Sequence, residues 1–185
     1  MDARSHPIAP TAEEDTTDTL LLWVLVWSEL AAFGILLAGF LLVGLVQPDA
    51  YAAARLHLDP LLAGINTLVL LTSGWQAALA TRPRASLGQR RRALVNAALL
   101  GFAFVAIKLF EYSTEAGVAG DPAYGSFFEL YFLVTGFHLL HVAFGALVLL
   151  IVAWRPAPGN VALITTLWHV IDLVWIVMFP LVYLV

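Results

Sequence analysis

Five long apolar stretches dominate this 185-residue sequence and constrain its fold more than any other feature. They cover residues 20–46, 60–80, 93–112, 127–154 and 161–185. A helix needs roughly 20 apolar residues to cross the hydrocarbon core of a bilayer, and each stretch is about that long or longer. Backbone groups in lipid must be hydrogen-bonded within the spanning structure, and these runs do not alternate like the strands of a membrane barrel. We therefore predict an all-α integral membrane bundle of five transmembrane helices.

The composition excludes several other classes of protein. Apolar residues make up 61% of the chain and charged residues only 12%, which is the reverse of a disordered sequence. There is no cysteine, so disulfide scaffolds, thiolate metal sites and cysteine nucleophiles are excluded. The net charge is −4 and no long basic run lies on a polar face, which argues against a nucleic-acid partner.

The distribution of arginine predicts the orientation of the bundle. Of the eight basic residues outside the apolar stretches, seven fall on one side of a five-span topology, and Arg55 falls on the other. The loop between the second and third stretches alone holds Arg82, Arg84, Arg90, Arg91 and Arg92. Because cytoplasmic loops carry the excess of Lys and Arg, we predict a cytoplasmic N-terminus. Residues 1–19 are acidic and lack the basic start of a secretory signal, so we expect a flexible tail before a 20–185 membrane domain.

Most of the ionisable residues inside the stretches occur in pairs that are three residues apart. The pairs are Lys108 with Glu111, His138 with His141, and His169 with Asp172, and the single carboxylates are Glu29 and Glu129. Residues at this spacing share one helix face. Charged groups in a membrane are costly and usually face protein or water. We therefore predict an intramembrane polar network on the third, fourth and fifth helices.

Each group has more than one interpretation from the residues alone. Lys108 is expected to form an ion-pair cluster with Glu111, Glu129 or both, the alternative being a substrate-binding role. The simplest interpretation of His138 and His141 is hydrogen bonding across helices, the alternative being metal or haem ligation with help from His169.

The residues alone also leave more than one interpretation for the remaining groups. His169 and Asp172 either pair with each other or bridge to another helix. Glu29 is either a proton-handling group or a gate, or a neutral carboxyl that is hydrogen-bonded inside the bundle.

Five ordered motifs resemble subunit III of haem-copper oxidases. They are WSELAAF at residues 27–33, INTLVLLTSG at 65–74, KLFEY at 108–112, YGSFF with YFLVTGFHLLHV at 124–142, and WHVIDLVW at 168–175. The resemblance covers about residues 20–185. The chain has no counterpart of the first two helices of seven-helix members, and so resembles the five-helix members. In the seven-helix form, lipids occupy a V-shaped cleft beside those two helices.

The resemblance implies an accessory subunit without cofactors of its own. Haem and metal would belong to the catalytic subunit I, a separate subunit would receive electrons, and the complex would lie in a bacterial inner membrane. Glu29 matches the family's buried carboxylate, which lies near subunit I and is linked to proton uptake or oxygen access. Glu111, the three histidines and Asp172 match intramembrane polar positions. Arg155 matches a position that contacts lipid headgroups, so structural phospholipid is an expected ligand.

A narrower resemblance points to the NorE branch, which is associated with nitric oxide reductase. The ending WIVMFPLVYL at residues 175–184 and the stretch FELYFLVTGFHLLH at 128–141 are similar to that branch. We expect this branch ahead of a subunit of a terminal cytochrome c or quinol oxidase. Rivals from other classes are an independent small membrane transporter, a small membrane cytochrome with histidine ligands, and an enzyme acting on lipids or quinones.

Overall fold

The computed structural model describes residues 12–185, which form six helices and no strand. The helices are α1 (Ala12–Val46), α2 (Pro48–Arg55), α3 (Pro60–Ala80), α4 (Leu87–Ala119), α5 (Gly125–Trp154) and α6 (Pro158–Tyr183). All except α2 are long and apolar enough to cross a membrane, so the prediction of five spanning helices is confirmed. The predicted flexible tail lies outside the described residues for positions 1–11, and helical backbone begins at Ala12.

Two features of the helices differ from the sequence prediction. Helix α4 begins six residues earlier and ends seven residues later than expected. Its 33 residues are about 50 Å long, which exceeds the thickness of the hydrocarbon core, so its ends lie beyond the apolar stretch. A capping box starts it: Ser86 accepts from the backbone N–H of Gln89, whose side chain accepts from the backbone N–H of Ser86. The short helix α2 was not predicted, because its eight residues lie between two spans.

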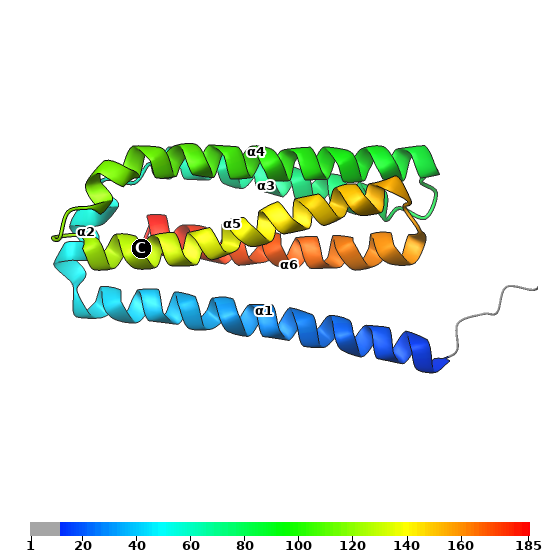
Figure 1. The fold of residues 1–185 in the computed structure, drawn as a ribbon, viewed down its shortest axis with the longest axis horizontal. Coiled ribbons are helices and arrows are strands. Elements are labelled where there is room, and N and C mark those ends of the chain that lie inside the picture. Colours follow the sequence, from blue (N-terminus) through cyan, green and yellow to red (C-terminus); the bar gives the residue numbers. More distant parts are fainter. Residues whose placement is uncertain (1–11) are drawn as a thin grey trace, which may run out of the picture.

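Helices α3 to α6 form a four-helix bundle, and α1 runs along one side of it (Figure 1). Helix α1 contacts α5 and α6 and is the least buried of the five spanning helices. Its exposed apolar side chains include Trp23, Trp27 and Ile35. This exposure fits a helix that faces lipid or another protein chain along most of its length.

Side-chain hydrogen bonds join neighbouring helices inside the bundle. Ser73 Oγ donates to the Ala97 carbonyl at 2.6 Å, and Asn66 Nδ2 donates to the Phe104 carbonyl at 3.2 Å, so α3 is tied to α4. Trp175 Nε1 donates to Thr67 Oγ1 at 2.9 Å and ties α6 to α3. Such bonds hold helices together where lipid offers no hydrophobic driving force between them.

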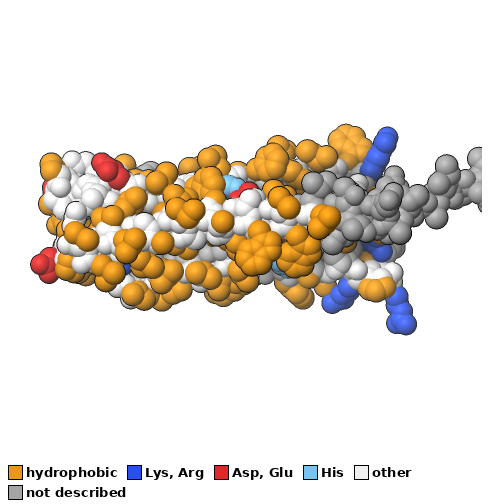
Figure 2. Space-filling view, turned by 90° about the horizontal axis from the view of Figure 1, so that it is seen from below, with side chains coloured by type: hydrophobic (Ala, Val, Ile, Leu, Met, Phe, Trp, Pro, Cys, Tyr) orange, Lys and Arg blue, Asp and Glu red, His pale blue; other side chains and the backbone are white. Residues whose placement is uncertain are grey.

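Basic and acidic side chains gather at opposite ends of the bundle. Figure 2 shows most of the visible Lys and Arg side chains at the right-hand end of the bundle, and most of the visible Asp and Glu side chains toward the left-hand end. The α3–α4 and α5–α6 loops lie at the basic end, and α2 lies at the acidic end (Figure 1). The predicted cytoplasmic side corresponds to the basic end, and this orientation stays a prediction.

The indole of Trp168 fills a gap that two glycines leave open. Trp168 is fully buried on α6. A Cβ added at Gly101 of α4 would lie 2.7 Å from its Cη2 atom, and a Cβ at Gly145 of α5 would lie 2.9 Å from its Cζ3 atom. Both distances are shorter than real Cβ contacts allow. The absence of a side chain on α4 and α5 therefore lets the three helices approach one another.

We expect Gly101→Ala and Gly145→Ala to destabilise the bundle. Overpacking against Trp168 costs about 1–3 kcal/mol, which exceeds the gain of about 0.5–1 kcal/mol in helix propensity. The measurement is the unfolding midpoint in mixed detergent micelles, followed by circular dichroism. Gly117→Ala on α4 is the matched control, because a Cβ there meets nothing within 4 Å and should stabilise slightly. Equal midpoints for all three variants would contradict this account of Trp168.

Candidate functional site

A lysine lies at the centre of the largest polar cluster. The Lys108 side chain on α4 is 0% exposed, and its Nζ atom lies 3.0 Å from Glu111 Oε2. The ammonium group also donates to the hydroxyl of Tyr131 on α5, at 2.7 Å, and to the hydroxyl of Tyr183 on α6. One cation therefore bonds groups from three helices. It also lies 4.7 Å from the centre of the Tyr131 ring, within cation–π range.

The hydroxyls of the two tyrosines bridge the Lys108 ammonium group and the carboxylates. The Tyr183 hydroxyl donates to Glu111 Oε1 at 2.6 Å. The Tyr131 hydroxyl lies 3.1 Å from Glu111 Oε1 and 3.0 Å from Glu115 Oε1, and its single proton serves one of them at a time. The cluster, defined as Lys108, Glu111, Glu115, Tyr131 and Tyr183, is almost completely buried. Its arrangement neutralises a charge that would otherwise be costly in the membrane.

The predicted ion pair of Lys108 with Glu111 is present, but the second carboxylate is Glu115. Glu129 is exposed on α5, and no hydrogen bond or ion pair joins it to the described residues. Glu115 was not predicted because it lies three residues beyond the expected end of its helix. Its spacing of four from Glu111 and seven from Lys108 places it on the same helix face, and this signal could have identified it.

Glu29 and His141 form a second polar pair, between α1 and α5. Glu29 Oε2 lies 2.9 Å from His141 Nε2, and both side chains are half-buried. His141 Nδ1 lies 2.7 Å from the Phe137 carbonyl, which can only accept, so Nδ1 carries a proton. The Nε2–Oε2 contact then needs one further proton, held by either the imidazole or the carboxyl. Glu29 and His141 therefore share one proton at the contact between α5 and α1, the least buried spanning helix.

The other two histidines have different surroundings. His169 Nδ1 lies 3.6 Å from Asp172 Oδ2, as expected for a pair on one helix. The Asp172 carboxylate occupies the space beside Gly74 of α3, where an added Cβ would overlap it. His138 is fully buried and stacks on Trp175, with ring centres 5.2 Å apart. Neither ring nitrogen of His138 has a hydrogen-bond partner among the described residues, so hydrogen bonding across helices holds for His141 and not for His138.

The intramembrane positions thus form separate groups rather than one network. Lys108 with Glu111, Glu29 with His141, and His169 with Asp172 are distinct pairs, while His138 is packed among aromatic rings. Among the side chains that the structure describes, no three His, Asp or Glu side chains come together as a metal site would require.

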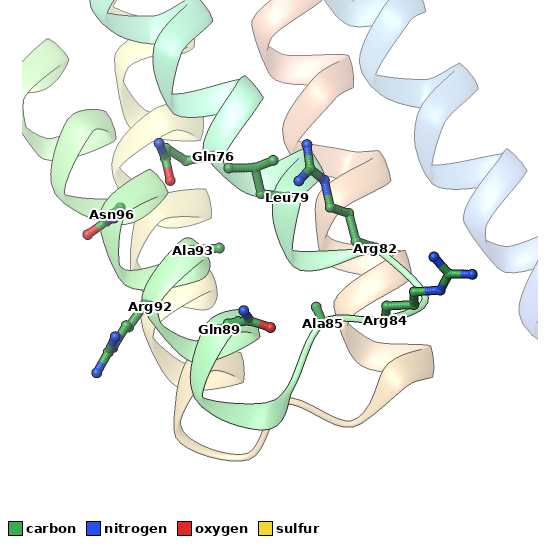
Figure 3. Close-up of a pocket in the computed structure, with 9 residues that line it drawn as sticks. All are labelled: Gln76, Leu79, Arg82, Arg84, Ala85, Gln89, Arg92, Ala93 and Asn96. Carbon is green, nitrogen blue, oxygen red and sulfur yellow. The ribbon is translucent and has the colours of Figure 1, made fainter.

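A hollow of about 420 Å³ lies at the basic end, between the end of α3 and the start of α4, and arginines are among its lining residues. Its lining includes Gln76, Gln89, Arg82, Arg84 and Arg92. Figure 3 shows Gln89 directed toward the hollow, whereas the guanidinium groups of Arg84 and Arg92 extend outward on opposite sides. Arg155 is exposed directly after α5, at the same end. The arrangement places positive charge where headgroups of a bilayer would lie.

Comparison with known proteins identifies the family. The family model for cytochrome c oxidase subunit III matches residues 54–185. The chain belongs to the cytochrome c oxidase subunit III family. It is 33% identical to "Cytochrome c oxidase subunit 3" of Synechocystis sp., over 85% of this chain and 71% of the relative.

Two further relatives match this chain over its full length. "Cytochrome c oxidase subunit 3" of Thermostichus vulcanus is 29% identical over 100% of this chain and 96% of the relative. "Probable quinol oxidase subunit 3" of Staphylococcus aureus is 29% identical over 100% of this chain and 94% of the relative. The predicted membership in the haem-copper oxidase subunit III family is confirmed.

We expect Lys108→Met to cost about 3–5 kcal/mol of stability, because it leaves two buried carboxylates without their cation. The measurement is again the unfolding midpoint in mixed micelles. The double variant Lys108→Met with Glu111→Gln should recover part of the loss, since it removes one uncompensated charge. Arg91→Gln, on an exposed side chain, is the control and should change stability little. A loss below about 1 kcal/mol for Lys108→Met would show that the cluster does not hold the helices together.

Proposed function

We propose that this chain is a non-catalytic accessory subunit III of a haem-copper respiratory complex in a bacterial inner membrane. The family match over residues 54–185 carries the proposal. The chain would associate with the catalytic subunit I, stabilise it and maintain the lipid interface between them. Haem and metal would belong to that catalytic subunit, and a further subunit would receive electrons.

The internal arrangement of polar groups supports an accessory role. The Lys108 cluster is enclosed and its charges bond one another, so it acts as a structural tie between helices. Outside it, the long apolar surface of α1 carries the half-buried Glu29–His141 pair. A surface of this kind suits contact with a neighbouring membrane chain or with lipid.

Two kinds of complex fit this proposal. The names of the relatives favour a terminal cytochrome c or quinol oxidase. The similarity of residues 128–141 and 175–184 to the NorE branch favours a nitric oxide reductase. The length of the chain does not distinguish the two kinds of complex, because a relative named as a cytochrome c oxidase subunit is matched over 96% of its own length. We infer a terminal oxidase first and keep nitric oxide reductase as the second candidate.

Co-purification tests the proposal directly. Mass spectrometry of the tagged chain, extracted from its native membrane in mild detergent, should identify a large haem-copper subunit. A copper-bearing or quinol-oxidase subunit II beside it would indicate a terminal oxidase, and a c-type cytochrome subunit would indicate nitric oxide reductase. A chain that purifies alone would contradict the proposal and favour an independent transporter, to be assayed in liposomes.

The Glu29–His141 contact gives a second prediction. Glu29→Gln should leave assembly intact, because the amide N–H can donate to His141 Nε2 and replace the hydrogen bond. The amide cannot release a proton, so we expect the complex to lose activity sooner during prolonged turnover. Glu129→Gln, on the exposed carboxylate of α5, is the control and should match the unchanged chain. Equal active lifetimes for both variants would limit Glu29 to a packing role.

A further inference from the structure

A second cavity lies at the acidic end of the bundle, where α1, α2 and the end of α6 meet. Its volume is about 570 Å³, within the range of small-molecule sites. Its walls are mainly apolar. The lining residues used below are Phe40, Gly44, Tyr51, Ala52, Arg55 and Leu181. This cavity is distinct from the hollow between α3 and α4, which lies at the basic end of the bundle.

One wall of the cavity carries a buried phenol without a partner. Tyr51 is 2% exposed, and its ring packs against Phe40 and Phe127. The ring lies directly over Gly44, where an added Cβ would be 3.0 Å from its Cδ1 atom. Its hydroxyl makes no hydrogen bond to any described residue. Burying a hydroxyl without a partner is costly, so the position suits a ligand that accepts a hydrogen bond.

Arg55 lies four residues further along α2, on the same face as Tyr51. Its Nε atom is buried and has no hydrogen-bond partner among the described residues, and no ion pair involving Arg55 occurs there. Burial lowers the pKa of Arg55 and raises the pKa of Tyr51. Both shifts reflect donors that have lost water without gaining an acceptor. An anionic oxygen beside them would restore the lost interactions.

We propose that this cavity binds one phospholipid, with its phosphate at Arg55 and Tyr51 and part of an acyl chain along Phe40, Gly44 and Leu181. A guanidinium group binds phosphate through paired N–H donors. The apolar walls match an acyl chain, and in a bilayer spanned by the five long helices the acidic end of the bundle would lie at the level of the headgroups. A neutral quinone would leave the arginine charge unpaired. The proposal deepens the lipid-interface part of the proposed function and rests on it.

Native mass spectrometry with phosphatidylglycerol tests this site. The full chain is purified in mild detergent with whatever subunits remain attached, and the lipid is then titrated in. Arg55→Gln should weaken binding of one lipid about tenfold to a hundredfold, because it removes a charge-assisted contact. Tyr51→Phe should weaken the same binding less. Arg91→Gln, an equal charge change at the opposite end on an exposed residue, should leave it unchanged.

A second variant covers the case in which Arg55→Gln disturbs folding. Ala52→Phe fills the cavity, removes no donor, and should also displace the lipid. Unchanged phosphatidylglycerol binding by both variants would overturn the proposal. Inorganic phosphate that binds the unchanged chain as tightly as the lipid would overturn it as well. The same spectra report whether subunit I is attached, so loss of the partner, which contradicts the proposed function, is separable from absence of a lipid site.

Discussion

The need to compensate charge within a bilayer determines the arrangement of this bundle. Lys108 lies fully buried on α4, and its ammonium group is bonded by Glu111 and by hydroxyls from α5 and α6. Removing water from a cation costs free energy, and this cost is offset only when polar partners replace the water. The partners come from three helices, so the cost of burying one charge becomes a constraint on how those helices pack. The glycines beside Trp168 act on the same three helices sterically, because the missing side chains let α4, α5 and α6 approach one another.

The sequence predicts the spans well because length and hydropathy alone determine which segments can cross a bilayer. It predicts their ends less well, since a helix continues into the headgroup region while its hydropathy falls. Helix α4 shows this clearly: Arg90, Arg91 and Arg92 resemble a loop by composition, although the capping box at Ser86 and Gln89 marks the true start. Helix α2 has no signal of its own beyond a proline at its first position.

Within the polar groups, the local pairs were predictable and the partners across helices were not. Lys108 with Glu111 and His169 with Asp172 follow from spacing on one helix. Glu29 and His141 are 112 positions apart, and no periodicity relates them. Tyr131 and Tyr183 are neutral and are counted among the apolar residues of the sequence. Their hydroxyls can therefore be recognised as partners of Lys108 only once the helices are placed. Glu129 was predicted as a partner of Lys108, whereas the structure has Glu115. Glu115 was missed because the predicted third helix ended at residue 112, before this carboxylate.

The same requirement for partners distinguishes two kinds of polar group in this chain. Where the chain satisfies its own polar groups, as around Lys108, the residues are explained by stability and need no ligand or partner. Other buried polar groups lack partners in the described chain: His138 lies among aromatic rings in the interior, whereas Arg55 and Tyr51 line a cavity at the acidic end. Glu29 is intermediate, since it is bonded to His141 and still half-exposed on α1. An accessory subunit must remain stable by itself while leaving some donors free for its surroundings, and in this chain the unsatisfied donors of α2 lie beside its least buried spanning helix.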